Sequence, residues 1–323
     1  LYIKQIYWIG YGLVAMFIAL ALDYRMFSRY AYLIYFLTLL ALAYVLVNGV
    51  IASGARRWIH IGSISIQVSE FAKVSLIIAL AKYFESGKMS NQYTLKDLII
   101  PALMTTAIGG LIVVQPDLGT TMMILFIFLV FVAAIELERM TLIKLFTGGL
   151  MLAPALWFFL KDYQKTRLLT LFNPELDPLG AGYHSIQSKI AIGSGGFWGK
   201  GLLAGTQSRL NFLPEKHTDF IFSVFAEETG FFGVVILLSL FLFVILKGLN
   251  IAFRAADRFG FFLSLGLVSS ITFYIIFNVG MTIGLFPITG IPLPFLSYGG
   301  SSLITHFFAV GLLLNVEMRR SMH

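Results

Sequence analysis

Residues 220–246 read FIFSVFAEETGFFGVVILLSLFLFVIL, a run long and apolar enough to cross a lipid bilayer as one helix. The rest of the chain has the same character, being 58% hydrophobic and 12% charged with a mean hydropathy of +0.87. A soluble domain carries about 25% charged residues. The sequence therefore predicts an all-α polytopic integral membrane protein, with residues 1–323 forming a single membrane domain.

Similar apolar runs predict about nine transmembrane helices. They cover residues 5–22, 30–51, 68–84, 97–114, 118–135, 142–160, 220–246, 259–283 and 300–316. Alternate connections, together with the C-terminal tail, carry 12 of the 23 basic residues, namely Arg25, Arg29, Lys82, Lys88, Lys96, Arg139, Lys144, Lys247, Arg254, Arg258, Arg319 and Arg320. Short basic loops stay in the cytoplasm. The C-terminus is therefore expected to be cytoplasmic and residue 1 to lie outside.

The opposite, outer face is expected to hold the connections 52–67 and 284–299, a turn at Gln115-Pro116, and the long loop 161–219. Loops of this length are usually functional or disordered. This one contains too many aromatic and branched residues to remain solvated. We therefore expect an ordered extracytoplasmic cap.

Several classes of protein are disfavoured by composition. The net charge of +7 is explained by cytoplasmic anchoring and membrane lipid rather than by nucleic acid. Because the chain has no cysteine, it has no disulfides, iron–sulfur clusters or thiolate metal sites. The five histidines are scattered, and no phosphate-binding loop, dinucleotide fingerprint or nucleophile elbow occurs.

Charged residues near the expected outer surface mark two candidate sites. The first site includes Arg56, Arg57 and Trp58, and its two arginines are expected on the outer side although most basic residues are expected on the cytoplasmic side. It also includes Glu70 and Lys73, which are three residues apart on a helix and can therefore face one another. They form either a rim for an anionic headgroup or an ordinary helix start with a snorkelling pair. Asp117, at the head of the span 118–135, is expected to act as a helix N-cap.

Two further candidates lie where outer loops enter the membrane. Asp219 closes the loop 161–219, and Ser223, Ala226 and Gly230 would place small residues beside it on a helix. That stripe leaves space for a ligand or a neighbouring helix, and capping is the plainer role for Asp219. The Pro/Gly-rich residues 290–302 cannot form a lipid-facing helix. Their Gly-Gly-Ser-Ser helix start either presents N–H groups to phosphate or is a structural turn.

These motifs resemble the SEDS family, named for shape, elongation, division and sporulation. The resemblance covers essentially the whole chain and rests on residues 69–73, 115–120, 173–196, 205–207, 211–223 and 290–302. The middle motifs are similar to its rod-shape branch, RodA, rather than to its division branch, FtsW. Members have ten spans with both termini cytoplasmic, so the nine expected here indicate that the first span is missing from this chain.

The resemblance implies a glycosyltransferase that polymerises peptidoglycan from lipid II at the outer face of the bacterial cytoplasmic membrane during cell elongation. It implies a class B penicillin-binding protein and the elongation machinery as partners, and magnesium or manganese as a cation. The family's essential aspartate matches Asp219, which we assign as the catalytic base or a metal-assisted base, with the metal ligands otherwise open. Expected substrate contacts are Arg56, Arg57, Trp58, Glu70, Lys73, Arg209, Lys216 and Ser223.

Two alternatives remain. A lipid II flippase would also contain broken helices and buried ions, although the ionisable groups here gather at one face. A non-catalytic scaffold for a penicillin-binding protein would need no carboxylate beside basic groups.

Overall fold

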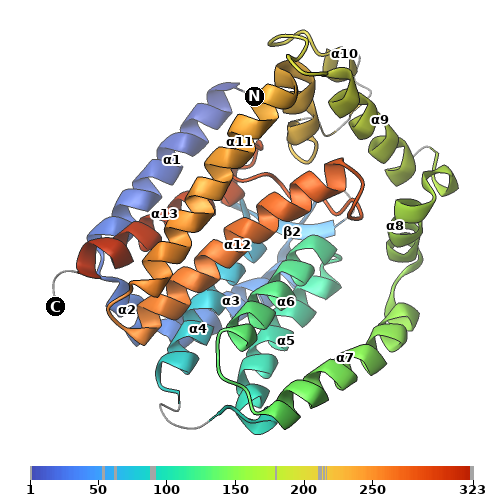
Figure 1. The fold of residues 1–323 in the computed structure, drawn as a ribbon. Coiled ribbons are helices and arrows are strands. Elements are labelled where there is room, and N and C mark those ends of the chain that lie inside the picture. Colours follow the sequence, from blue (N-terminus) through green and yellow to red (C-terminus); the bar gives the residue numbers. More distant parts are fainter. Residues whose placement is uncertain are drawn as a thin grey trace. The chain divides into compact units, whose positions relative to one another are not determined.

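The computed structural model describes residues 2–52, 55–61, 64–87, 92–178, 180–209, 213, 215 and 217–320. Most of this part of the chain is helical (Figure 1), which confirms the predicted all-α membrane fold. The chain forms two compact units. Unit 1 comprises Leu1–Glu136, Val244–Phe273 and Tyr298–His323, and unit 2 comprises Leu137–Phe243 and Tyr274–Ser297.

A helix occupies each of the nine expected spans. They are α1 (Tyr2–Ala21), α3 (Ala31–Asn48), α4 (Val68–Glu85), α5 (Ile99–Val114), α6 (Leu118–Ala133), α7 (Arg139–Phe159), α11 (Ile221–Phe253), α12 (Arg258–Thr282) and α13 (Gly300–Arg319). Within the described residues, six helices are long and apolar enough to cross a membrane, α5 being counted with the preceding η1 (Leu95–Leu98). Of the others, α6 has 16 residues and α4 carries four charged side chains.

Unit 1 has α4 at its centre. Its side chains Leu76, Ile77 and Leu80 are fully buried, together with Ile108 of α5 and Phe131 of α6. By contrast, α1 and α3 expose most of their apolar residues, as expected of helices that face lipid. The most charged of these helices is therefore the one best shielded from the membrane.

A three-stranded antiparallel sheet that hydropathy did not indicate begins at Val50, inside the expected span 30–51, and continues through the connection 52–67. The strands are β1 (Val50–Ala52), β2 (Ala55–Ile61) and β3 (Ile64–Gln67), in that order. Trp58 pairs with Val50 on one side and with Gln67 on the other. Because α4 starts directly after β3, and the Gln67 N–H donates to Ser301 Oγ at 3.0 Å, the sheet fixes the start of α4 against α13.

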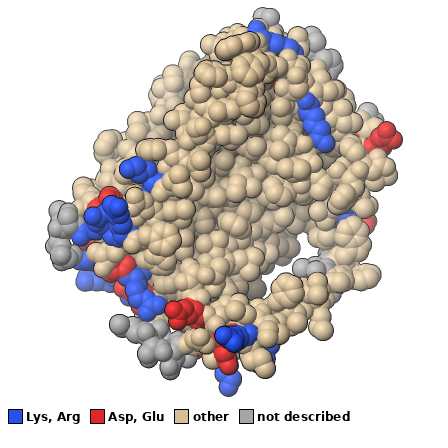
Figure 2. Space-filling model, viewed as in Figure 1, with Lys and Arg blue, Asp and Glu red and all other residues tan. Residues whose placement is uncertain are grey.

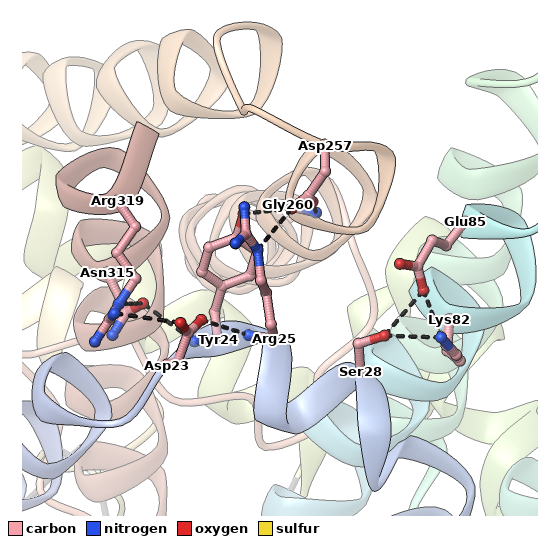
Figure 3. A network of polar contacts seen from close by, with 10 residues as sticks. All are labelled: Asp23, Tyr24, Arg25, Ser28, Lys82, Glu85, Asp257, Gly260, Asn315 and Arg319. Carbon is pink, nitrogen blue, oxygen red and sulfur yellow. Dashed lines mark hydrogen bonds and ion pairs between the residues drawn. The ribbon is translucent and has the colours of Figure 1, made fainter. Parts of the chain in front are cut away.

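A polar network fastens the connection between α1 and the short helix α2 (Tyr24–Arg29), as Figure 3 shows. The buried Asn315 amide donates to Ala19 O and Leu20 O at 2.8 Å, and its Oδ1 accepts from the Tyr24 N–H at 3.2 Å. Asn315 thereby satisfies carbonyl groups that the end of α1 leaves without helical partners.

The Tyr24 hydroxyl extends the same network to α12. It donates to Asp257 Oδ2 at 2.5 Å, and Asp257 Oδ1 accepts from the Gly260 N–H at 2.7 Å. Burial, and then the hydrogen bond to Asp257, raise the pKa of Tyr24 to about 12. In Figure 2, charged side chains gather around this end of unit 1. Residues 231–246 of α11 carry no charge.

Unit 2 contains the long loop, which is ordered throughout its described part. It forms α8 (Asp162–Phe172), η2 (Pro174–Leu176), α9 (Ala181–Ser194) and α10 (Thr206–Arg209). The side chain of Asn173 caps η2 by accepting from the Glu175 N–H at 3.2 Å. Asp177 Oδ2 accepts from the N–H of Ala181, the first residue of α9, at 2.7 Å. Residues 173–178 and 180 therefore form the turn between α8 and α9. The described part of the loop is largely helical, and its position outside the membrane stays a prediction.

Candidate active site

Asp219 lies in the turn that precedes α11 and is half-buried. Its backbone is held by Asn278 of α12, a residue with no exposed surface. The Asn278 amide donates to Asp219 O at 2.9 Å and to Ile291 O at 2.7 Å. One buried side chain therefore joins the Asp219 turn to the Pro/Gly-rich segment that follows α12.

That segment approaches Asp219 through a glycine. Gly290 has a φ of +76°, and a Cβ atom at this position would lie 3.3 Å from Asp219 Oδ2. Farther along, Ser297 Oγ donates to Thr218 O at 2.6 Å and accepts from the Leu293 N–H at 2.7 Å. Residues 284–297 thus bracket the turn 218–219, and Gly290 leaves room beside the carboxylate.

The cap helix α9 packs behind this turn. Ser188 Oγ donates to Thr282 O at 2.6 Å and lies 2.7 Å from Ser223 Oγ, and neither serine has exposed surface. Close by, Ala191 and Phe220 form a buried apolar cluster with Leu213. The small residue Ser223 therefore contacts a neighbouring helix, one of the two roles that the stripe beside Asp219 allowed, and a substrate contact there stays a prediction.

The surroundings of Asp219 make its carboxylate a stronger base than usual. Burial, and then the charge of Glu215, raise the pKa of Asp219 to about 6. A hydrogen bond from Thr218 and the charge of Arg167 on α8 act in the opposite direction. A carboxylate with a pKa near neutrality is suited to general base catalysis.

A second polar cluster lies in unit 1, on α4 and α13. Lys73 Nζ is 2.8 Å from Glu70 Oε2, and both side chains are at most 5% exposed. Thr305 Oγ1 donates to the same Glu70 oxygen at 3.1 Å, and His306 is buried next to Thr305. The predicted pairing of Glu70 with Lys73 is confirmed. The two side chains are buried inside the protein and do not snorkel towards the membrane surface.

The arginines of β2 make backbone contacts. Arg57 donates to Gln115 O at 2.9 Å and to Pro116 O, whereas the exposed Arg56 donates to Val47 O at 3.2 Å. Arg57 therefore supports the turn before α6, where Asp117 accepts from the Thr120 N–H at 3.2 Å as the predicted N-cap. Diphosphate contacts by either arginine, and a platform role for the half-buried Trp58, stay predictions.

The remaining predicted contacts divide between the units. Ser223 is in unit 2 with Asp219, whereas Arg56, Arg57, Trp58, Glu70 and Lys73 are in unit 1. Lys216 and the side chain of Arg209 lie outside the described residues.

Sequence reasoning named the segment 290–302 as a candidate but did not indicate that Gly290 and Ser297 lie against the Asp219 turn, and it missed Asn278 and Arg167. Asn278 could have been identified from the sequence, because it is an isolated amide inside the largely apolar span 259–283, where polar groups usually have a function.

The described residues near Asp219 offer few ligands for a divalent cation. Among the described residues, no three His, Cys, Asp or Glu side chains come together to hold a metal ion. Magnesium is often bound by only one or two carboxylates together with phosphate oxygens of the substrate. Asp219 therefore fits a cation that arrives with a diphosphate, and the described residues do not form a complete site of their own.

This chain is similar to known proteins over nearly its full length. Residues 1–322 match the model of the FtsW, RodA and SpoVE family, described as cell cycle proteins. The peptidoglycan glycosyltransferase MrdB of Escherichia coli K12 is 39% identical over 330 residues, which cover 99% of this chain and 86% of that protein.

Two solved structures share the fold. A chain of a peptidoglycan synthase complex superimposes with a TM-score of 0.84 at 34% identity, covering 99% of this chain and 90% of that chain. The rod shape determining protein RodA of Thermus thermophilus gives a TM-score of 0.71 at 31% identity, covering 98% of this chain and 87% of that chain. The chain therefore belongs to the FtsW, RodA and SpoVE family.

Proposed function

We propose that this protein is a peptidoglycan glycosyltransferase that polymerises lipid II in the bacterial cytoplasmic membrane. The observation that carries the proposal is Asp219, a half-buried carboxylate with a raised pKa that buried side chains hold at the end of a membrane helix. The full-length similarity to MrdB, named a peptidoglycan glycosyltransferase, supports the same activity.

The proposed reaction forms one glycosidic bond. The acceptor hydroxyl attacks the anomeric carbon of the donor sugar, the bond from that carbon to the lipid diphosphate breaks, and Asp219 takes the hydroxyl proton. Gly290 leaves space for the acceptor next to Asp219 Oδ2, because a side chain there would contact the carboxylate. Asn278 and Ser297 keep the carboxylate in place without contacting the reacting atoms.

The leaving diphosphate needs positive charge nearby. Within unit 2, Arg167 acts electrostatically on Asp219, and the ammonium of Lys189 lies against Gly284 in the segment that brackets the turn. Both are proposed as diphosphate contacts beside the five basic residues expected from the sequence, which are Arg56, Arg57, Lys73, Arg209 and Lys216. A magnesium or manganese ion bound with the substrate, with Asp219 as one ligand, would supply further positive charge.

The partners and location follow from the same activity. The structural similarity to a chain of a peptidoglycan synthase complex supports assembly with a cross-linking enzyme, which we propose is a class B penicillin-binding protein of the elongation machinery. Lipid II carries its polyprenyl tail in the bilayer. Because basic residues gather in alternate connections and in the C-terminal tail, we propose that the Asp219 end of α11 faces outward and that the C-terminus is cytoplasmic.

The decisive experiment replaces Asp219 by asparagine, which keeps the size of the side chain and removes the base. A general base contributes about 10²–10⁴-fold to the rate, so Asp219→Asn should lower lipid II polymerisation by about 10²-fold or more. The assay uses purified protein with its partner and measures glycan strands.

The matched control is Asp117→Asn, because an asparagine can still cap α6 and polymerisation should persist. Polymerisation by Asp219→Asn at the rate of the unmodified protein would exclude the catalytic assignment. Lipid II movement between leaflets by a protein with no polymerase activity would instead identify a flippase.

A further inference from the structure

The loop between α9 and α10 is joined to α11 at the point where that helix is broken. Gly230 interrupts α11 with non-helical angles, φ 66° and ψ −167°. Four backbone hydrogen bonds of 2.9–3.2 Å connect the loop to the break: from the N–H of Phe231 to Gly196 O, of Phe232 to Phe197 O, of Lys200 to Glu227 O and of Gly201 to Glu228 O. The loop therefore satisfies polar groups that the broken helix leaves open.

A buried carboxylate fixes the loop from a second side. Glu227 has no exposed surface, and its Oε1 accepts from Lys200 Nζ at 2.7 Å and from the backbone N–H groups of Thr206 at 2.8 Å and Gln207 at 3.1 Å. Gly199 allows the close approach, since a Cβ atom there would lie 2.2 Å from Glu228 O. The loop is held rigidly against α11.

This rigid loop nevertheless presents large apolar side chains outward. Trp198 is 76% exposed and Leu202 is 81% exposed, and the Trp198 ring lies 6.0 Å from the ring of Phe232, which is itself 53% exposed. We call the exposed group the aromatic tip; it comprises Phe197, Trp198, Leu202, Leu203, Phe231 and Phe232. Exposed apolar surface of this kind marks a contact with a partner or a membrane.

The position of the aromatic tip along α11 indicates which of these it is. Residues 231–246 are sixteen uncharged residues that end at Lys247, and at 1.5 Å per residue they span about 24 Å. The hydrocarbon core of a bilayer is about 30 Å thick. With Lys247 at one boundary, the aromatic tip lies within a few ångström of the other, the depth at which tryptophan gathers in membrane proteins.

The exposed face of α11 below the break continues the same surface. Val235, Leu240 and Phe243 are all exposed and belong to a helix apolar enough to span the membrane. We propose that the aromatic tip inserts between the acyl chains and headgroups of the bilayer, so that lipid covers it. The tip then anchors the cap at a fixed depth, and with it α9, the helix that packs behind the Asp219 turn.

Spin labels can test this insertion, since the chain has no cysteine to remove. Trp198→Cys and Leu202→Cys would each be labelled with a nitroxide in the full chain, reconstituted in phosphatidylcholine vesicles. Collision with oxygen, which concentrates in hydrocarbon, is compared with collision with a water-soluble nickel chelate. Leu240→Cys on the exposed face of α11 gives the lipid reference, and Glu175→Cys on the cap gives the water reference.

We expect the ratio of oxygen to nickel collisions at 198 and 202 to be several-fold above that at 175 and to approach that at 240. A ratio equal to that at 175 would place the tip in water and overturn the proposal. Weak collision with both reagents at 198 and 202 would show that protein covers the tip, which overturns it as well. Two label sites guard against a local effect of either substitution.

Discussion

Asp219 is subject to two opposing influences. Burial and the charge of Glu215 favour its protonated form, whereas Thr218 and Arg167 favour the ionised form. The balance leaves a pKa of about 6, so that about nine-tenths of the carboxyl groups are ionised at pH 7. The protein thus keeps the base ionised at neutral pH and also more basic than a solvated aspartate.

The pH dependence of polymerisation should report this balance. The base must be ionised, so kcat/KM should fall as the pH is lowered through about 6, the pKa of Asp219. Glu215→Gln removes a charge that raises this pKa and should move the fall to lower pH. Arg167→Gln removes a charge that lowers it and should move the fall to higher pH.

The control for these shifts is Glu175→Gln, an exposed acidic residue of the cap that is not among the groups acting on Asp219. Its profile should match that of the unmodified protein. Shifts of Glu215→Gln and Arg167→Gln in the same direction would contradict the assignment of the acidic limb to Asp219.

Asn278 should affect the rate through position alone. Asn278→Ala leaves Asp219 O and Ile291 O without their buried donor, which costs about 1–3 kcal/mol of stability. A displaced base also lowers the rate, by up to about 10²-fold for a movement of about 1 Å. Measured on folded protein, kcat should therefore fall while KM changes little.

Asn315→Ala is the matched comparison for Asn278→Ala. Asn315 is also fully buried and also clamps backbone carbonyls, but it does so at the end of α1 in unit 1. Its loss should lower the melting temperature and leave kcat unchanged. Equal loss of kcat in both variants would mean that Asn278 acts only through general stability.

At the scale of elements, α4 shows how a charged helix is accommodated in a membrane protein. Thirteen of its 18 residues are buried, and the two charges near its start, Glu70 and Lys73, are paired inside unit 1. Charges facing lipid are costly. This cost explains why α4 occupies the interior while the more apolar α1 and α3 lie on the exposed side.

The pair on α4 can be tested by single and double replacement. Lys73→Met leaves Glu70 as an unpaired buried charge, so it should destabilise the protein by about 3–5 kcal/mol. Glu70→Gln with Lys73→Met removes both charges and should restore most of this stability. We expect the double variant to remain poorly active, because Lys73 is predicted to contact diphosphate. Thermal unfolding and lipid II polymerisation would be measured side by side.

The result for the double variant separates the two roles of Lys73. Recovery of stability without recovery of polymerisation supports a diphosphate contact. Recovery of both would show that the pair is structural only, and the predicted contact would then be wrong.

At the scale of the whole molecule, the sequence predicted the helices better than the contacts between them. Hydropathy located the helix in each of the nine expected ranges, because a helix that crosses lipid requires a long apolar run. The N-cap at Asp117 was also predicted, because it depends on neighbouring residues. The sheet of β1–β3 was missed, since its strands are short and lie in a connection that hydropathy treats as a loop.

The support of the active site was missed for a related reason. Asn278 lies 59 residues from Asp219 in the sequence, and Ser297 lies 79 residues from Thr218. Local pattern carries no information about such pairs. Asn278 could have been identified as a polar residue in an apolar span, but its partner depends on how α11 and α12 pack.

The orientation of the molecule yields the last prediction. The basic residues in alternate connections predict that the connection before α5 faces the cytoplasm and that the cap of α8–α10 faces outward. Lys96 and Glu175 are exposed residues in these two regions, and the chain has no native cysteine. A membrane-impermeant maleimide added to intact cells should therefore label Glu175→Cys at once, and Lys96→Cys only after the cells are permeabilised. Labelling of Lys96→Cys in intact cells without labelling of Glu175→Cys would reverse the orientation. Asp219, at the end of α11 that adjoins the cap, would then face the cytoplasm, and polymerisation at the outer surface would be excluded.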